Sequence, residues 1–330
     1  MMREKGRRSR SGLMFAVHAV VIGAFLSLGF GSVQADDRLG VVVTTGMIAD
    51  AARAIGGDRV EVEALMGPGV DPHSYRQTRS DIMKLTQADL VLWHGLYLEA
   101  QMEAFLDRLA RRQTVVAVAE VLPRERLIGH SDYDNKFDPH VWMDPALWEP
   151  VVDRVLEAMI DARPEAAEHF RAGAEAYRQE IARLDAYATE ATATVPPERR
   201  ALLTAHDAFA YFGRRFDFDV IGIQGISTES EAGLKRIRDL VDLLVERDIA
   251  AVFVESSVPE RNVRALVEGA RSQGHDVRVA GTLYSDAMGK PGTYEGTYIG
   301  MIDHNITTIV GALGGDVPAA GMQGKLDRDE

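Results

Sequence analysis

The chain has 330 residues, with 50 acidic residues against 37 basic ones and a formal net charge of −13 at pH 7. This acidic balance, without clustered Lys and Arg, excludes a surface suited to nucleic acid. The sequence contains no cysteine, which excludes a disulfide framework, a thiolate metal site, a cysteine nucleophile and a lipid anchor on a cysteine.

The N-terminal segment is predicted to be a cleavable signal peptide. Basic residues crowd Met1–Ser11, an apolar run covers Leu13–Phe30, and "SVQADD" then places Val33 and Ala35 at the two critical cleavage positions. A membrane-anchoring helix is the alternative, because the apolar run is near the lower length limit for spanning a bilayer. The polar, acidic stretch that follows favours cleavage, so we expect a soluble periplasmic product that lacks residues 1–35.

Short apolar runs alternate with helical patterns along the rest of the chain, as in α/β folds. The predicted strands are Leu39–Thr44, Val60–Leu65, Leu90–Trp93, Val115–Val118, Ala201–Thr204, Val220–Ile223, Ala250–Val254 and Val277–Ala280. The predicted helices lie near Ile48–Ile55, Ser80–Thr86, Leu98–Ala110, Ala208–Phe216, Leu234–Glu246, Glu260–Ser272 and Thr297–Leu313. Two series of about four strands favour two lobes, each a mainly parallel sheet flanked by helices, over one large sheet.

The stretch between the two series differs in composition. Residues Pro164–Val195 are rich in Ala, Glu and Arg, and Pro196-Pro197 ends the run. A helix of this length would span about 48 Å, which is more than the diameter of one such lobe. A coiled-coil arm is the alternative, but the apolar positions do not keep a heptad for long enough. We therefore predict one long helix that joins the lobes and limits hinge motion between them.

These patterns predict the organisation of the whole chain. The expected parts are a signal peptide at 1–35, an N-terminal lobe at 36–163, a linking helix at 164–195 and a C-terminal lobe at 196–330. The tail from Gly314 onwards, rich in Gly, Ala and charged residues, is expected to be frayed.

A repeated tripeptide directs attention to the candidate chemistry. The chain has only 9 histidines, yet two of its three Asp-Pro pairs are followed by one, at His73 in "GVDPHSY" and His140 in "KFDPHVW". Ligands of open α/β sheets bind beyond the carboxyl ends of strands. His206 follows one predicted strand by two residues and Asp286 follows another by six. Singly, each is explained as a surface, turn or capping residue; together, three imidazoles and a carboxylate suit a first-row divalent cation.

Other polar residues are weaker candidates. His94 ends a predicted strand and could edge the cleft, while His130 lies in a polar loop and could help to capture metal. Glu255, at the end of another strand, is the best candidate for a hydrogen-bond acceptor behind a ligand, or for an alternative ligand. The histidines to which we assign no role are His18, which leaves with the signal peptide, and His169, His275 and His304.

Ordered motifs over nearly the whole mature chain resemble those of the metal-ion solute-binding proteins of ABC transporters, in the zinc/manganese group and its TroA-like branch. The matching stretches are "GVDPHSY", "ADLVLWHGLYLE", "DPHVWMDP", "TAHDAFAYFGRRF", "IQGISTESEAG", "VFVESSV", "LYSDAMG" and "GTYIGMIDHN". The resemblance implies two α/β lobes tied by one long helix. It also implies that His73, His140, His206 and Asp286 hold one metal ion between the lobes.

The resemblance leaves the identity of the metal open between Zn²⁺ and Mn²⁺. Zinc-dedicated members often carry a long loop rich in His and acids before the second ligand, whereas the stretch Gly129–Asp138 is short and has one His. Many manganese members have Glu at the third ligand, where this chain has His206. Because three nitrogens and one carboxylate suit zinc better, zinc is favoured.

The predicted function is capture of a divalent metal ion in the periplasm and its delivery to the membrane permease of an ABC transporter. The protein is expected to be a monomer and not an enzyme. The alternative is a zinc-dependent hydrolase with an open metal site and Glu255 as general base, although the chain has no H-E-x-x-H motif. An adhesin or structural surface protein is a third class, with no sequence feature of its own here.

Overall fold

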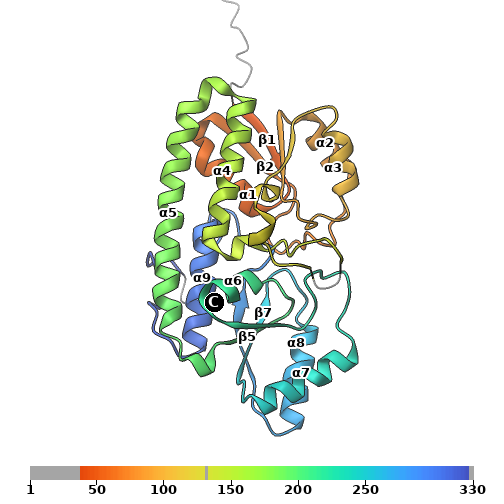
Figure 1. Cartoon of the computed structure of the whole chain (residues 1–330), viewed down its shortest axis with the longest axis vertical. Coiled ribbons are helices and arrows are strands. Elements are labelled where there is room, and N and C mark those ends of the chain that lie inside the picture. Colours follow the sequence, from red (N-terminus) through yellow and green to blue (C-terminus); the bar gives the residue numbers. More distant parts are fainter. Residues whose placement is uncertain (1–37, 131–132, 327–330) are drawn as a thin grey trace, which may run out of the picture. The chain divides into compact units, whose positions relative to one another are not determined.

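The computed structural model describes residues 38–130 and 133–326, and the described residues belong to one compact unit. The predicted signal peptide, with His18, lies outside the described residues. Within the unit, two α/β lobes are joined by one long helix, α5 (Ala167–Ala193; Figure 1). Among the described residues, no helix is both long enough and apolar enough to cross a bilayer.

The first lobe is built on a four-stranded parallel sheet with the strand order β2-β1-β3-β4. Its elements are β1 (Leu39–Val43), α1 (Gly46–Gly56), β2 (Val60–Ala64), α2 (Arg79–Gln87), β3 (Leu90–Trp93), α3 (Glu103–Leu109) and β4 (Val115–Ala117). The two inner strands are almost wholly buried, as expected for a parallel sheet covered on both faces. The four predicted strands of this lobe are confirmed.

The second lobe contains two parallel pairs, β5-β6 and β7-β8, instead of one continuous ladder. Its elements are β5 (Ala201–Thr204), α6 (Ala210–Phe216), β6 (Asp219–Gly222), α7 (Leu234–Glu246), β7 (Ala251–Glu255), α8 (Arg261–Ser272), β8 (Arg278–Leu283) and α9 (Tyr298–Ala312). Strands β5 and β7 lie side by side, so the pairs adjoin. The predicted strands of this lobe are also confirmed, but β8 continues to Leu283, three residues beyond its predicted end.

One long helix connects the lobes, and a second packs along it. The predicted linking helix is confirmed as α5 (Ala167–Ala193), preceded by a 3₁₀ turn at Pro164–Ala166. The sequence reading missed α4 (Pro145–Ala162), which packs along α5, although Asp144 and Pro145 form an ordinary helix start. Because α5 also packs against α1 of the first lobe and α9 of the second, it fastens both lobes along its length.

A glycine permits the close contact between α5 and the first lobe. A Cβ atom at Gly173 would lie 2.3 Å from the backbone oxygen of Ile55, at the end of α1. Only a residue without a side chain therefore allows the two helices to approach this closely.

Two local predictions were wrong. The helix expected from Leu98 begins only at Glu103, because Leu96 and Tyr97 adopt positive φ and a turn follows them. The tail is not frayed up to Leu326. Within this tail, the backbone amide of Asp316 donates to the hydroxyl of Thr194, and the backbone amide of Met322 donates to the carboxylate of Asp303 on α9.

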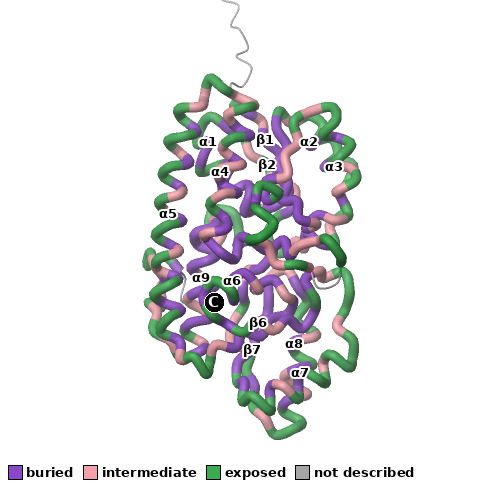
Figure 2. Tube along the Cα trace, viewed as in Figure 1, coloured by how far each residue is buried: buried purple, intermediate pink, exposed green. Residues whose placement is uncertain are grey.

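The main apolar core runs through both lobes instead of stopping at a boundary. It includes residues of β1, α1, α4 and α5 as well as residues of α6 and α9. Figure 2 shows this buried interior beneath exposed outer faces of the helices. A shared core of this kind holds the loops of the two lobes in defined positions where they meet.

Candidate metal centre

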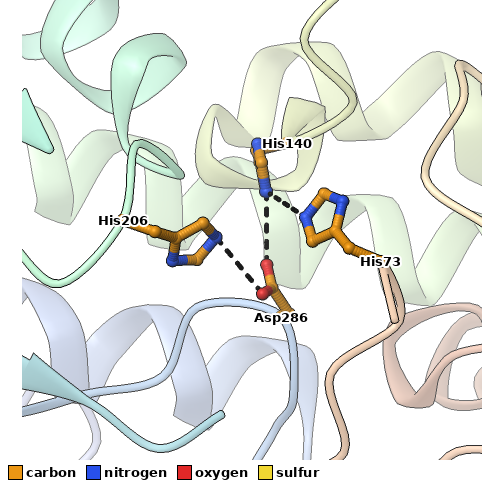
Figure 3. A group of neighbouring side chains, drawn as sticks. All are labelled: His73, His140, His206 and Asp286. Atoms are coloured by element: carbon orange, nitrogen blue, oxygen red, sulfur yellow. Dashed lines mark hydrogen bonds and ion pairs between the residues drawn. The ribbon is translucent and has the colours of Figure 1, made fainter. Parts of the chain in front are cut away.

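The four predicted ligand residues come together where the loops of the two lobes meet. His73 lies in the loop after β2 and His206 lies two residues after β5. Asp286 lies three residues after β8, and His140 directly precedes the 3₁₀ turn that leads into α4. All four side chains are buried and point toward one another (Figure 3).

The potential donor atoms form a tight group. One ligand atom from each residue lies within 4.8 Å of those of the other three. The Nε2 atoms of His73 and His140 are 3.2 Å apart. The two oxygens of Asp286 face different rings, with Oδ1 lying 3.3 Å from Nε2 of His140 and Oδ2 lying 3.2 Å from Nε2 of His206. Among the described residues, this is the group of His and acidic side chains whose geometry could hold a metal ion.

Asp138 orients the imidazole of His140. Its Oδ1 accepts a 2.6 Å hydrogen bond from Nδ1 of His140 and a second, of 3.0 Å, from the backbone amide of the same residue. The first bond keeps a proton on Nδ1, so that Nε2 faces the cluster and can bind a metal ion once it has lost its own proton. The role of Asp138 behind the ligand was not predicted from the sequence.

Glu255 has the same function behind His206. Its Oε2 lies 2.5 Å from Nδ1 of His206 and its Oε1 accepts the backbone amide of the same residue at 2.8 Å. Since Glu255 ends β7 and His206 follows β5, the neighbouring strands set this contact. Of the two possibilities raised by the sequence, the structure supports the hydrogen-bond acceptor, because Glu255 is not one of the four clustered residues.

The loop that carries His73 is held by Asp71. Oδ1 of Asp71 accepts the backbone amide of His73 at 2.9 Å, and Oδ2 accepts the hydroxyl of Ser74 at 2.8 Å. Both Asp-Pro-His tripeptides therefore use their aspartate to fix the following histidine backbone. Only Asp138 also contacts the ring.

The electrostatics of the cluster make it receptive to a cation. Burial lowers the pKa of His73 to about 3, and the neighbouring imidazoles act in the same direction. Burial alone would also lower the pKa of His140, but Asp138 and Asp286 raise it to about 9. Burial would raise the pKa of Asp286, but His206 and His140 hold it well below its usual range. At neutral pH the site therefore combines an ionised carboxylate and the neutral imidazole of His73 with the imidazole of His140, which must lose a proton before it can bind a cation.

The weaker candidates lie outside the cluster. His94 is buried behind it, with Nε2 2.7 Å from the carbonyl oxygen of Pro139 and its ring stacked over Trp148. His130 is partly exposed and packs against Tyr133. The remaining described histidines have Nε2 within hydrogen-bond distance of a backbone carbonyl oxygen; they are His169, His275 and His304.

The chain is similar to known metal-binding proteins over most of its length. It is 47% identical over 308 residues to the manganese-binding lipoprotein MntA of Bacillus subtilis, covering 92% of this chain and 99% of that protein. It is 45% identical over 286 residues to the zinc-binding protein TroA of Treponema pallidum, covering 86% of this chain and 92% of TroA. The solved structure of periplasmic TroA superposes with a TM-score of 0.81 at 44% identity, covering 84% of this chain and 99% of that one.

Two lobes are tied by a long helix, and a buried group of three imidazoles and one carboxylate lies where their loops meet. Together with the similarity to TroA, this arrangement defines a metal-ion solute-binding protein of an ABC transporter and not an enzyme. The chain belongs to the family of the periplasmic component A of the zinc-uptake complex, which matches residues 41–312. Membership of this family implies an ABC permease as the partner and a metal ion as the ligand.

Proposed function

We propose that His73, His140, His206 and Asp286 bind one divalent transition-metal ion, which the protein delivers to its permease. The spacing of the donor atoms is the observation that carries this assignment. Donors placed about 2.05 Å from a tetrahedral zinc ion are about 3.3 Å apart. Three of the six donor pairs lie 3.2, 3.3 and 3.2 Å apart, and all six lie within 4.8 Å.

The short distance between the Nε2 atoms of His73 and His140 supports the same assignment. In the metal-free protein a proton is held among these groups, because Asp138 and Asp286 raise the pKa of His140 to about 9. Two facing ring nitrogens with lone pairs repel each other unless a cation or a proton lies between them. A bound metal ion would take the place of this proton and would also satisfy Oδ1 of Asp286, which is buried without a hydrogen-bond partner in the described part of the chain.

Zinc is the favoured ion, and manganese is the alternative. Three nitrogens and one carboxylate oxygen form a complete tetrahedral zinc site. Both oxygens of Asp286 face the cluster, however, and a bidentate carboxylate would supply the additional oxygen that manganese prefers. The relatives do not decide between the two, because one is named for manganese and the other for zinc.

The protein is proposed to act outside the inner membrane, as a monomer, after cleavage of residues 1–35. The lobe boundaries predicted at 36–163, 164–195 and 196–330 belong to the same proposal. It is supported by the signal-like leader, the absence of a cysteine that could carry a lipid, and the periplasmic description of the family.

Competitive titration of the metal-free protein with zinc and manganese tests the proposal. We expect one ion per chain, tighter binding of zinc, and severe loss of affinity in His206→Ala. Thr189→Val, a substitution on the exposed face of α5, is a control that should bind like the wild type. Unchanged metal affinity in both His140→Ala and His206→Ala would refute the ligand assignment.

A further inference from the structure

One carboxylate of the metal-binding loop is shared between the two lobes. Asp71 of the first lobe accepts a 2.6 Å hydrogen bond at Oδ2 from the hydroxyl of Thr228, which lies in the second lobe between β6 and α7. Through its other oxygen, Asp71 holds the backbone amide of His73. A contact between the lobes is therefore only one side chain away from a proposed metal ligand.

The segment that carries Thr228 is folded so that it reaches the first lobe. The buried side chain of Gln224 donates from Nε2 to the carbonyl oxygen of Ser230 at 3.0 Å and closes residues 224–230 into a loop. A second contact between the lobes accompanies it, because Gln101 of the first lobe donates to Glu229. We call residues 224–230 the crossing loop.

The crossing loop lies on the side of the cleft away from the linking helix. In Figure 1 the chain that leads into α7 follows the edge opposite α5. The lobes are joined covalently through α5, so their free edges separate most when the cleft opens. A contact at this edge has the greatest leverage on opening, and the Thr228–Asp71 hydrogen bond is located there.

We propose that Thr228 is a latch that keeps the lobes closed over the bound ion and thereby slows its release. The inference rests on the proposed function of the cluster as a site for transported metal. Thr228 is a positioning residue, because it acts on the ion through Asp71 and the backbone of His73.

The physical basis is a hydrogen bond to an ionised acceptor, which is stronger than a bond between neutral groups. Because the bond forms only when the lobes are closed, its loss should speed opening and metal release. The encounter of the ion with an open cleft does not use the bond, so the association rate should stay the same. This combination separates a latch from a ligand, whose loss would also change the donor set and the spectrum of the bound ion.

The experiment compares Thr228→Val, which removes the hydroxyl but keeps the shape, with Thr228→Ser, which keeps the hydroxyl. Metal release into an excess of chelator is followed by stopped flow, with Co²⁺ as a spectroscopic probe in place of zinc. We expect release to be about tenfold faster in Thr228→Val and restored in Thr228→Ser, with unchanged association rates and d–d spectra. Thr228→Ala provides a second variant without the hydroxyl.

The outcomes separate the two proposals. Equal release rates in the wild type, Thr228→Val and Thr228→Ala would overturn the latch and leave the metal-binding function intact. A wild-type protein that binds none of Co²⁺, zinc and manganese would overturn the proposed function itself. A changed d–d spectrum in Thr228→Val would also refute the latch, because it would mean that Thr228 alters the coordination of the ion.

Discussion

The indole N–H of Trp142 donates a 2.9 Å hydrogen bond to the carbonyl oxygen of Ser285. Trp142 lies two residues after His140, and Ser285 directly precedes Asp286, so the bond joins a proposed ligand loop of one lobe to that of the other. Tyr298 strengthens the junction, because its hydroxyl donates to the carbonyl oxygen of Trp142 at 2.9 Å. The separation of His140 and Asp286 is thus fixed by buried groups that do not touch the ion.

Trp142→Phe should weaken metal binding about tenfold, because the Ser285 carbonyl loses its buried donor at a cost of about 1–3 kcal/mol and the two ligand loops lose their spacer. Isothermal titration with zinc measures the change. Trp148→Phe is the matched control, since Trp148 is also fully buried but is not the donor to the Ser285 carbonyl. Equal losses of affinity in both variants would indicate a general packing defect.

Asp138→Asn and Glu255→Gln should each weaken metal affinity about 10–100-fold, because the ligand histidine loses the carboxylate that orients its ring and increases its basicity. Competition with a chelator of known affinity measures the loss. Glu168→Gln neutralises an exposed acid on α5 and serves as the control. Hydrolytic activity that disappeared in Glu255→Gln would conflict with the role of Glu255 as a hydrogen-bond acceptor.

Metal binding should release protons at mildly alkaline pH. The pKa of His140 is raised to about 9 in the folded metal-free protein, above the ordinary value of 6.5, so the ion must displace a proton from the site. Calorimetric titration at pH 7.5 in buffers of different ionisation enthalpy should therefore give buffer-dependent binding enthalpies. Enthalpies that do not depend on the buffer would show that no net proton is released.

The same pKa shift predicts how the stability of the metal-free protein depends on pH. Because the folded pKa of His140 is raised, its contribution to stability is fully present below about pH 6.5 and is lost as the pH rises toward about 9. The increase in melting temperature on adding zinc should therefore be larger at pH 9 than at pH 6.5. Thermal unfolding monitored by circular dichroism measures both values. A smaller increase at pH 9 would contradict the prediction.

Gly173→Ala should destabilise the protein by more than about 1 kcal/mol, although alanine favours helices, because the new Cβ would collide with the Ile55 carbonyl. Gly311→Ala is the matched control within another helix. Its Cβ would meet only Val317, at 3.9 Å, so a gain of about 0.5–1 kcal/mol is expected. Urea unfolding of both variants provides the comparison.

Strand positions and the proposed ligands could be predicted from the sequence because both follow from local patterns. Buried parallel strands appear as short apolar runs, and loops after such strands carry the binding residues. The Asp-Pro-His repeat added a second local signal for His73 and His140. The structure brings these two residues together with His206 and Asp286, as that reasoning expected.

The residues that the sequence did not reveal act through contacts between distant parts of the chain. Trp142 and Ser285 meet across 143 positions, and Thr228 and Asp71 meet across 157. No periodicity or spacing reports such pairs, since they depend on how the lobes are oriented. Helix α4 was missed for a different reason, because its start signals, Asp144 and Pro145, directly follow the motif around His140.

The contacts of α5 with both lobes also bear on how metal release can begin. Long helices bend gently, and a bend of about 5° acting about 20 Å from its pivot displaces a side chain by about 2 Å, close to the length of a zinc–nitrogen bond. A small bend of helix α5 would therefore be enough to break the coordination of the metal ion. The receptor needs no large swing of its lobes, and a permease that strains this helix slightly could empty the site.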